Sequence, residues 1–141
     1  MKKIALFVAT TLLSVTAFAQ ERSAAPAGAK VSIIAPKAGA TVANPVKVTF
    51  GIKGMTLAPA GTKSDNSGHH HLLIDTPVPK DLSQPLPVIE NKVIHFGKAQ
   101  TEVTLTLPPG KHTLQLVLGD YLHIPHNPPV VSKKITINVQ P

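Results

Sequence analysis

The sequence contains no cysteine, and this absence excludes several kinds of site. Disulfide frameworks, thiolate zinc sites, iron–sulfur clusters, cysteine nucleophiles and blue-copper centres all require a cysteine sulfur. A lipid-modified amino terminus of the bacterial lipoprotein type is excluded for the same reason. Any metal ion must therefore be held by histidine, carboxylate, methionine or backbone groups.

Aromatic residues and clustered positive charge are also scarce. The chain has one tyrosine and no tryptophan, and its formal net charge of +7 comes from basic residues that are mostly scattered singly. A nucleic-acid-binding surface combines a clustered basic face with aromatic side chains that stack on bases. We therefore expect no nucleic-acid partner.

Long hydrophobic runs are missing except at the amino terminus. Residues 1–19 carry a pair of lysines, then an apolar stretch, and end in the tripeptide Ala-Phe-Ala. This is the pattern of a secretory signal peptide cleaved after Ala19. The run is shorter than the roughly 20 apolar residues of a membrane span. We expect a periplasmic protein whose mature chain has no membrane span.

Beyond the signal peptide, the sequence predicts a flexible leader and a single domain. Residues 20–29 are rich in Ala, Gly and Pro, a composition typical of flexible segments. Residues 30–141 alternate strand-like runs with turn residues and show no convincing helix. The strand-like runs cover 30–36, 45–55, 69–76, 92–96, 101–107, 111–120 and 130–139. About seven short strands of this kind predict an all-β fold, a single immunoglobulin-like antiparallel β-sandwich; a small barrel or jelly roll is the alternative.

Three adjacent histidines, His69, His70 and His71, open the third predicted strand. Because side chains alternate along a strand, His69 and His71 point to one face and His70 to the other. The sandwich topology brings further histidines near strand ends to the same pole, and these are His95, His123 and His126. We therefore predict that six histidines gather at one end of the domain.

These six histidines are candidate metal ligands. Imidazole ligation suits Cu, Zn, Ni and Fe, and the order of affinities favours copper, so we expect a copper ion, with zinc as the alternative. Asp75 and Asp120 are expected to hydrogen-bond ligand imidazoles and fix their tautomers. His112 lies at the opposite pole, where we expect a structural hydrogen bond at the corner between the fifth and sixth strands.

Three motifs carry a resemblance to a known family: GHHHLLID at 68–75, LPPGKHTLQLVLGD at 107–120 and HIPHNPPVVS at 123–132. Over residues 31–139 the chain resembles a family of short secreted bacterial proteins catalogued as a domain of unknown function. The resemblance implies one periplasmic β domain marked by these histidine motifs, and no particular activity. In class alone, the chain is similar to periplasmic copper-resistance carriers. Their amino-terminal histidine ligand is absent, since Gln20 would begin the mature chain, so a histidine-brace oxidase site is not expected.

Three functions remain open at this point. The first is a periplasmic metal-binding protein, a copper carrier or buffer that exchanges its ion with another periplasmic protein. The second is a cell-envelope interaction module whose histidines are structural or sense pH. The third is a mononuclear metalloenzyme, which needs fixed ligands and a vacant coordination position. No hydrolase nucleophile motif is present, and a non-enzymatic role is favoured.

Overall fold

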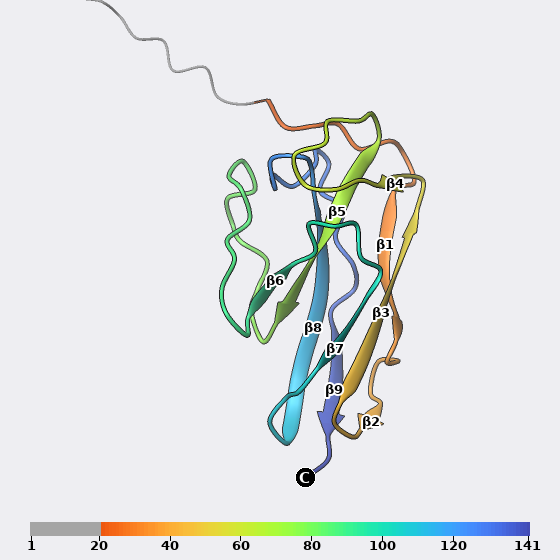
Figure 1. Cartoon of the computed structure of the whole chain (residues 1–141), viewed down its shortest axis with the longest axis vertical. Coiled ribbons are helices and arrows are strands. Elements are labelled where there is room, and N and C mark those ends of the chain that lie inside the picture. Colours follow the sequence, from red (N-terminus) through yellow and green to blue (C-terminus); the bar gives the residue numbers. More distant parts are fainter. Residues whose placement is uncertain (1–20) are drawn as a thin grey trace, which may run out of the picture.

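The computed structural model describes residues 21–141, and the predicted signal peptide lies outside this range. The described chain contains no helix, and so none that is long and apolar enough to cross a membrane. Its strands, shown in Figure 1, are β1 (Lys30–Ala35), β2 (Thr41–Val42), β3 (Val46–Lys53), β4 (Thr56–Leu57), β5 (Ser67–Ile74), β6 (Val93–His95), β7 (Glu102–Leu105), β8 (Gly110–Gly119) and β9 (Ile135–Val139).

The strands form two sheets that pack face to face. One sheet has the order β1-β3-β7, and the other has the order β2-β9-β8-β5-β4 with β6 also paired to β5. Each of the seven predicted runs overlaps one of these strands, with β5 and β8 beginning one or two residues earlier than predicted, while the two-residue strands β2 and β4 are additional. The prediction of an all-β, immunoglobulin-like sandwich is confirmed.

Alternating apolar residues from both sheets fill the space between them. Along β3, Val46, Val48 and Phe50 are buried, and the residues between them are exposed or half-buried, as a period of two predicts. These side chains pack in one cluster with Leu114 and Leu116 of β8. Because slipping a strand by one residue would turn its buried set to solvent, this core fixes the pairing register.

Strand β5 is buried along its whole length. The three-stranded sheet covers its inner face. On its outer face, Leu73 packs with Leu86 and Val93, which belong to the Pro-rich connection and to β6. A central strand that is covered on both faces has no solvent-facing side. Every polar side chain on β5 therefore lies in the protein interior.

Part of the predicted flexible leader 20–29 is hydrogen-bonded to the last loop of the domain. The Ala25 amide donates to the Asn127 carbonyl at 3.1 Å, and the Asn127 amide donates to the Ser23 carbonyl at 2.9 Å. The Ser23 hydroxyl donates to Oδ2 of Asp120 at 2.6 Å. Composition does not reveal such long-range pairing, and the sequence alone shows no sign of these contacts.

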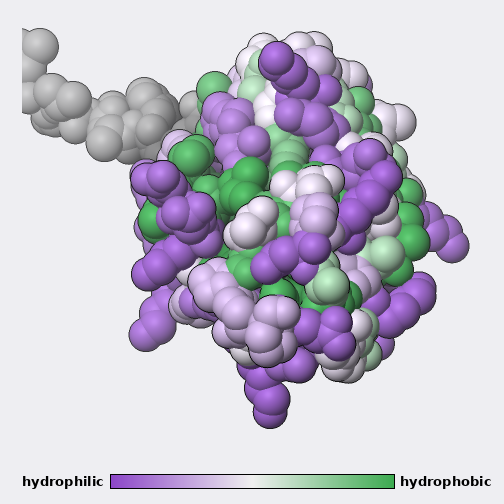
Figure 2. All heavy atoms as spheres, turned by 60° about the horizontal axis from the view of Figure 1, so that its bottom comes forward, coloured by the Kyte–Doolittle hydropathy of each residue, from purple (hydrophilic) through white to green (hydrophobic). Residues whose placement is uncertain are grey.

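The surface charge is dispersed. Figure 2 shows hydrophilic side chains spread over the face at the lower end of the domain, with smaller hydrophobic areas between them. An exposed ion pair joins Nζ of Lys47 and Oε2 of Glu102 at 3.0 Å. Exposed pairs of this kind contribute about 0–1 kcal/mol, so these charges favour solubility more than stability.

Candidate metal centre

Two imidazoles stand side by side on the outer face of β5. His69 and His71 are both fully buried, and their ring centroids lie 4.9 Å apart. The ladder to β8 fixes both positions, because His69 pairs with Gly119 and His71 pairs with Val117. The predicted alternation of the histidine triplet thus places two candidate ligands on one face of a central strand.

Two further imidazoles approach this pair from separate parts of the chain. His95 ends β6 directly opposite His71, and His123 lies in the loop after β8. The His95 and His123 centroids are 4.6 Å apart, and they lie 4.9 Å and 5.0 Å from that of His69. From His71, the corresponding distances are 5.2 Å and 5.9 Å. We name His69, His71, His95 and His123 the histidine cluster.

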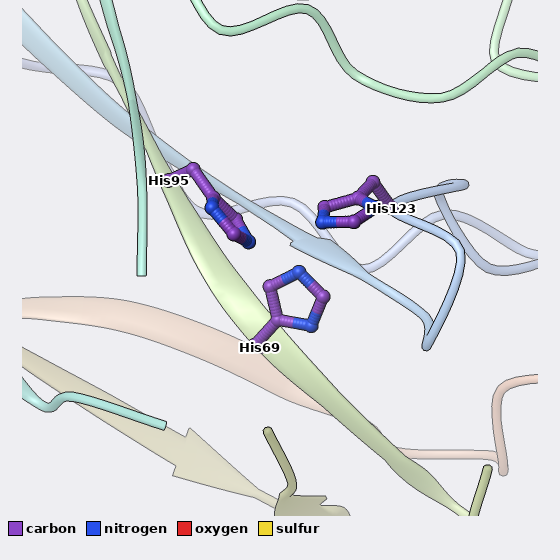
Figure 3. A group of neighbouring side chains, drawn as sticks. All are labelled: His69, His95 and His123. Carbon is purple, nitrogen blue, oxygen red and sulfur yellow. The ribbon is translucent and has the colours of Figure 1, made fainter. Parts of the chain in front are cut away.

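The geometry of the histidine cluster suits a single ion. One ring nitrogen from each of His69, His95 and His123 lies within 4.8 Å of the others. Figure 3 shows these three rings directed toward a common point, from β5, β6 and the loop after β8. Bonds of about 2.0–2.1 Å to one ion place ligand nitrogens roughly 3.3–4 Å apart, which is somewhat closer than the upper limit found here. The three rings therefore need only small movements to meet one metal ion.

The loop that carries His123 is fixed by a carboxylate. Oδ1 of Asp120 accepts hydrogen bonds from the amides of Leu122 at 2.9 Å and Ile124 at 3.0 Å. The His123 amide donates to the Asp120 carbonyl at 2.8 Å, and the His123 carbonyl accepts from the Leu86 amide at 2.8 Å. His123 itself has a φ of 68°, a left-handed conformation that needs such support. Asp120 therefore positions the His123 imidazole through the backbone.

Two glycines leave room for the rings. A Cβ at Gly119 would lie 2.7 Å from Cε1 of His71, and one at Gly97 would lie 2.8 Å from Nε2 of His95. Side chains do not tolerate such approaches, so both positions require glycine for close packing against an imidazole. The cluster is thus sterically prepared by residues that have no metal-binding groups themselves.

A loop before β5 is hydrogen-bonded to the residues next to His95 and His123. The Ala60 amide donates to the Gly97 carbonyl at 3.0 Å, and the Gly61 amide donates to the Tyr121 carbonyl at 2.9 Å. Gly97 follows His95 closely, and Tyr121 precedes His123. These bonds hold the β6 end and the loop after β8 at a fixed separation, which limits how far the two ligands can drift apart.

Three rings of the cluster, those of His69, His71 and His95, are neutral at ordinary pH. Burial, followed by the neighbouring imidazoles of His95 and His123, lowers the pKa of His69 to about 4. Burial and the neighbouring rings lower the pKa of His71 to about 3, and they lower that of His95 as well. A neutral imidazole offers a nitrogen lone pair to a metal. Proton competition is therefore weak at these positions near pH 7.

Residues 48–140 match the family described as a domain of unknown function, DUF4399. The chain belongs to the DUF4399 family. The resemblance to a family of unknown function is thus confirmed. The DUF4399 chain is also similar to solved fibronectin(III)-like modules of Clostridium thermocellum CbhA, with 14% identity, a TM-score of 0.41, and coverage of 78% of this chain and 93% of that one. No curated protein matches it.

Two of the six predicted ligands of this DUF4399 chain lie outside the cluster. His70 faces the sandwich core, where its ring centroid is 5.2 Å from that of Phe50. Nε2 of His126 donates to the Ser67 carbonyl at 3.0 Å, on the inner side of β5 beside Gly68. The structure therefore brings together four of the six histidines. The other two, His70 and His126, lie on the opposite face of β5 from the cluster.

Asp75, predicted to support a ligand, has a different partner. Its Oδ2 accepts from Nδ1 of His112 at 2.6 Å, and its Oδ1 accepts from the Thr113 amide at 2.7 Å. Nε2 of His112 donates to the Pro108 carbonyl at 2.8 Å, as the predicted structural role at this corner requires. Burial lowers the pKa of His112, but its hydrogen bonds to Asp75 and to the Pro108 carbonyl, together with the Asp75 charge, outweigh burial and raise this pKa. Both ring nitrogens face acceptors, an arrangement that the imidazolium satisfies. Asp75 belongs to this corner and contacts no cluster residue.

Several contributors to the site were not foreseen. Gly97, Gly119 and Leu86 carry no chemical signature of a metal site, and Ser23 lies far from the cluster in sequence. For the glycines, a usable signal existed. A glycine that ends a strand or follows one closely marks a place where another group approaches the backbone.

Proposed function

We propose that this protein binds one copper ion through the histidine cluster and acts as a periplasmic carrier or buffer, with zinc as the alternative metal. The observation that carries the proposal is the convergence of four imidazoles from β5, β6 and the loop after β8. Three of them offer ring nitrogens within 4.8 Å of one another. Ligands gathered from distant parts of a chain are characteristic of a metal site built by the fold.

The hydrogen bonding of the rings favours a ligand role over a structural one. Both ring nitrogens of His69 and of His71, and Nε2 of His95, are buried without a hydrogen-bond partner among the described residues. A buried polar group left unpaired costs about 1–3 kcal/mol. His112, which is structural, has both of its nitrogens bonded. A metal ion would use the lone pairs of the cluster and offset this cost.

His70 shows that missing hydrogen-bond partners alone do not indicate a metal site, and that the convergence of several imidazoles is the stronger argument. Its two ring nitrogens are also buried without partners, yet it packs singly against Phe50. One unpartnered imidazole in a core does not make a site. The support for metal binding comes from four imidazoles gathered at the outer face of one sheet.

The donor set supports copper, with zinc second. All four rings offer nitrogen, and the chain has no thiolate to offer. Imidazole ligands suit copper and zinc, and divalent copper has the highest affinity in the first-row series. A site that also takes the His71 nitrogen has four nitrogen ligands, a number that suits the tetrahedral preference of zinc. The relative affinities of the two metals are therefore the first quantity to measure.

The fourth ring supports a carrier or buffer over an enzyme. His71 lies within 5.9 Å of every other ring of the cluster, measured between centroids. Catalytic zinc sites keep three protein ligands and an open fourth position, whereas closed four-ligand sites hold the metal without chemistry. A four-histidine site would leave no position for substrate. The signal-peptide pattern of residues 1–19 supports a periplasmic location, where another periplasmic protein would exchange the ion.

A competition titration of the tag-free mature protein with Cu(II), Cu(I) and Zn(II) tests the proposal. We expect one tight equivalent. The double substitution His95→Ala plus His123→Ala should weaken binding by more than about 100-fold, since losing even an outer supporting group costs 10–100-fold. The matched control is His112→Ala, which removes a histidine outside the cluster and should leave affinity unchanged. Binding no tighter than about 1 μM for all three ions, or equal affinity in the double variant, would overturn the proposal.

A further inference from the structure

A basic groove runs along the free edge of the three-stranded sheet, away from the histidine cluster. It has a volume of about 900 Å³ and lies between β1 and the segment 129–135 that leads into β9. Its lining includes four lysines, Lys30, Lys37, Lys53 and Lys133, and no acidic residue. The groove is therefore a concave surface with charge of one sign.

Apolar side chains form the remaining wall of this groove. Ile33 and Ile52 line it from β1 and β3, and Val131 and Ile135 line it from the opposite side. Ile33 and Ile135 are only half-buried. A ligand that fits this groove must present apolar groups to these side chains and negative charge to the lysines.

The backbone of β1 is unpaired along the groove. β1 pairs with β3 alone. The Phe50 amide of β3 donates toward the β7 side, to Thr101, so the adjacent residue Gly51 faces β1, where its partner is Ser32. In antiparallel pairs the N–H and C=O of one residue point to the same side, and successive residues alternate. Val31 and Ile33 consequently direct their backbone N–H and C=O groups away from β3.

We propose that this groove binds an extended acidic peptide segment of a partner protein, which adds as a strand to the free edge of β1. The unpaired backbone groups of Val31 and Ile33 select an extended peptide, because strand addition satisfies them. Alternation along the added strand places one set of side chains on the apolar wall and the other set near the lysines. The surplus of lysine selects acidic residues for that second set. The groove lies apart from the histidine cluster, so this inference is independent of metal binding.

An NMR titration of the isotopically labelled mature protein tests the proposal. The probe is a short capped peptide in which valine and glutamate alternate, and its control has lysine in place of glutamate. We expect the glutamate peptide to shift the amide resonances of Val31, Ile33 and segment 129–135, and the lysine peptide to shift none of them. Dextran sulfate, a polyanion without a peptide backbone, should not reproduce the shifts at Val31 and Ile33.

Charge-reversal variants sharpen the test. Lys30→Glu with Lys133→Glu should weaken binding of the glutamate peptide by about 10-fold or more, because complementary charge becomes repulsion. The matched control is Lys98→Glu with Lys111→Glu, which changes the net charge equally at exposed sites outside the groove and should leave binding unchanged. Ile33→Pro removes one edge donor, a change that an edge strand tolerates, and should also weaken binding.

Three results would overturn the proposal. Equal binding of the glutamate and lysine peptides would remove the charge argument. Equal weakening by both double variants would mean that net charge alone, and no groove, attracts the peptide. Dextran sulfate shifts identical to those of the peptide would assign the surface to polyanions in general, without strand addition.

Discussion

We expect acid to unfold the metal-free protein at a higher pH than it unfolds most domains of this size. The perturbation acts on three buried imidazoles, whose pKa values in the folded state are about 4 for His69 and His70 and about 3 for His71, against 6.5 for a free ring. Between pH 6.5 and about 4, the unfolded chain binds protons that the folded chain excludes. Folding stability therefore falls as the pH falls through this window.

The expected loss is large compared with the stability of a typical domain. Each group contributes about 1.4 kcal/mol per pH unit below 6.5, so the three together contribute about 4 kcal/mol per unit. By pH 5 the loss reaches roughly 6 kcal/mol, which is comparable with the 5–15 kcal/mol that stabilises most domains. The pKa of His112 is raised, so its contribution is already complete at pH 6.5 and does not oppose the loss below that value.

Urea unfolding followed by circular dichroism, with a chelator present and in steps from about pH 7.5 to 5, measures this dependence. The variant His70→Leu removes one of the three groups without touching the histidine cluster and replaces it by an apolar side chain of similar volume. We expect it to reduce the slope by about a third. A free energy of unfolding that stays level between pH 7 and about 5, or a slope that is the same in the variant, would show that these rings are not buried as neutral groups.

Two further substitutions test the corner and the site separately. His112→Ala should lower stability by about 1–2 kcal/mol near pH 6. The cost should be smaller above the raised pKa of His112, because the wild-type protein then also lacks the charged bond to Asp75. Urea unfolding below and above that pKa measures the difference, and an equal cost at both pH values would refute the charge of His112. Gly119→Ala would place a Cβ 2.7 Å from Cε1 of His71, and should lower metal affinity by about 10-fold or more in the same competition titration, while an unchanged affinity would mean that the ring can move without loss.

Local sequence patterns predicted most of the fold. The alternation in β3 and β8 specified both strands and their buried faces, because a period of two admits one orientation. The same rule separated His69 and His71 from His70 before any contact was known. The alternation did not reveal to which sheet β6 belongs. Its pairing with β5 brings His95 opposite His71.

The mistaken assignments came from treating nearness in sequence as nearness in space. Asp75 follows His71 by four residues, but a strand rises about 3.3 Å per residue, so it lies at the far end of β5 beside His112. His126 follows His123 by three residues, yet the left-handed turn at His123 sends it to the other face of the sheet. Backbone reversals of this kind leave no periodic trace in a sequence.

The bond between the Ser23 hydroxyl and the Asp120 carboxylate joins residues 97 positions apart. We therefore expect the site to form late in folding. The turn that presents His123 is complete only after the beginning and the end of the domain have met, and contacts of such long sequence separation form slowly. Zinc fingers differ, because their metal supplies the folding energy. Here an extensive core already holds the sandwich together, so an ion would arrive at a finished receptor, and a partly folded chain would have no completed site to fill.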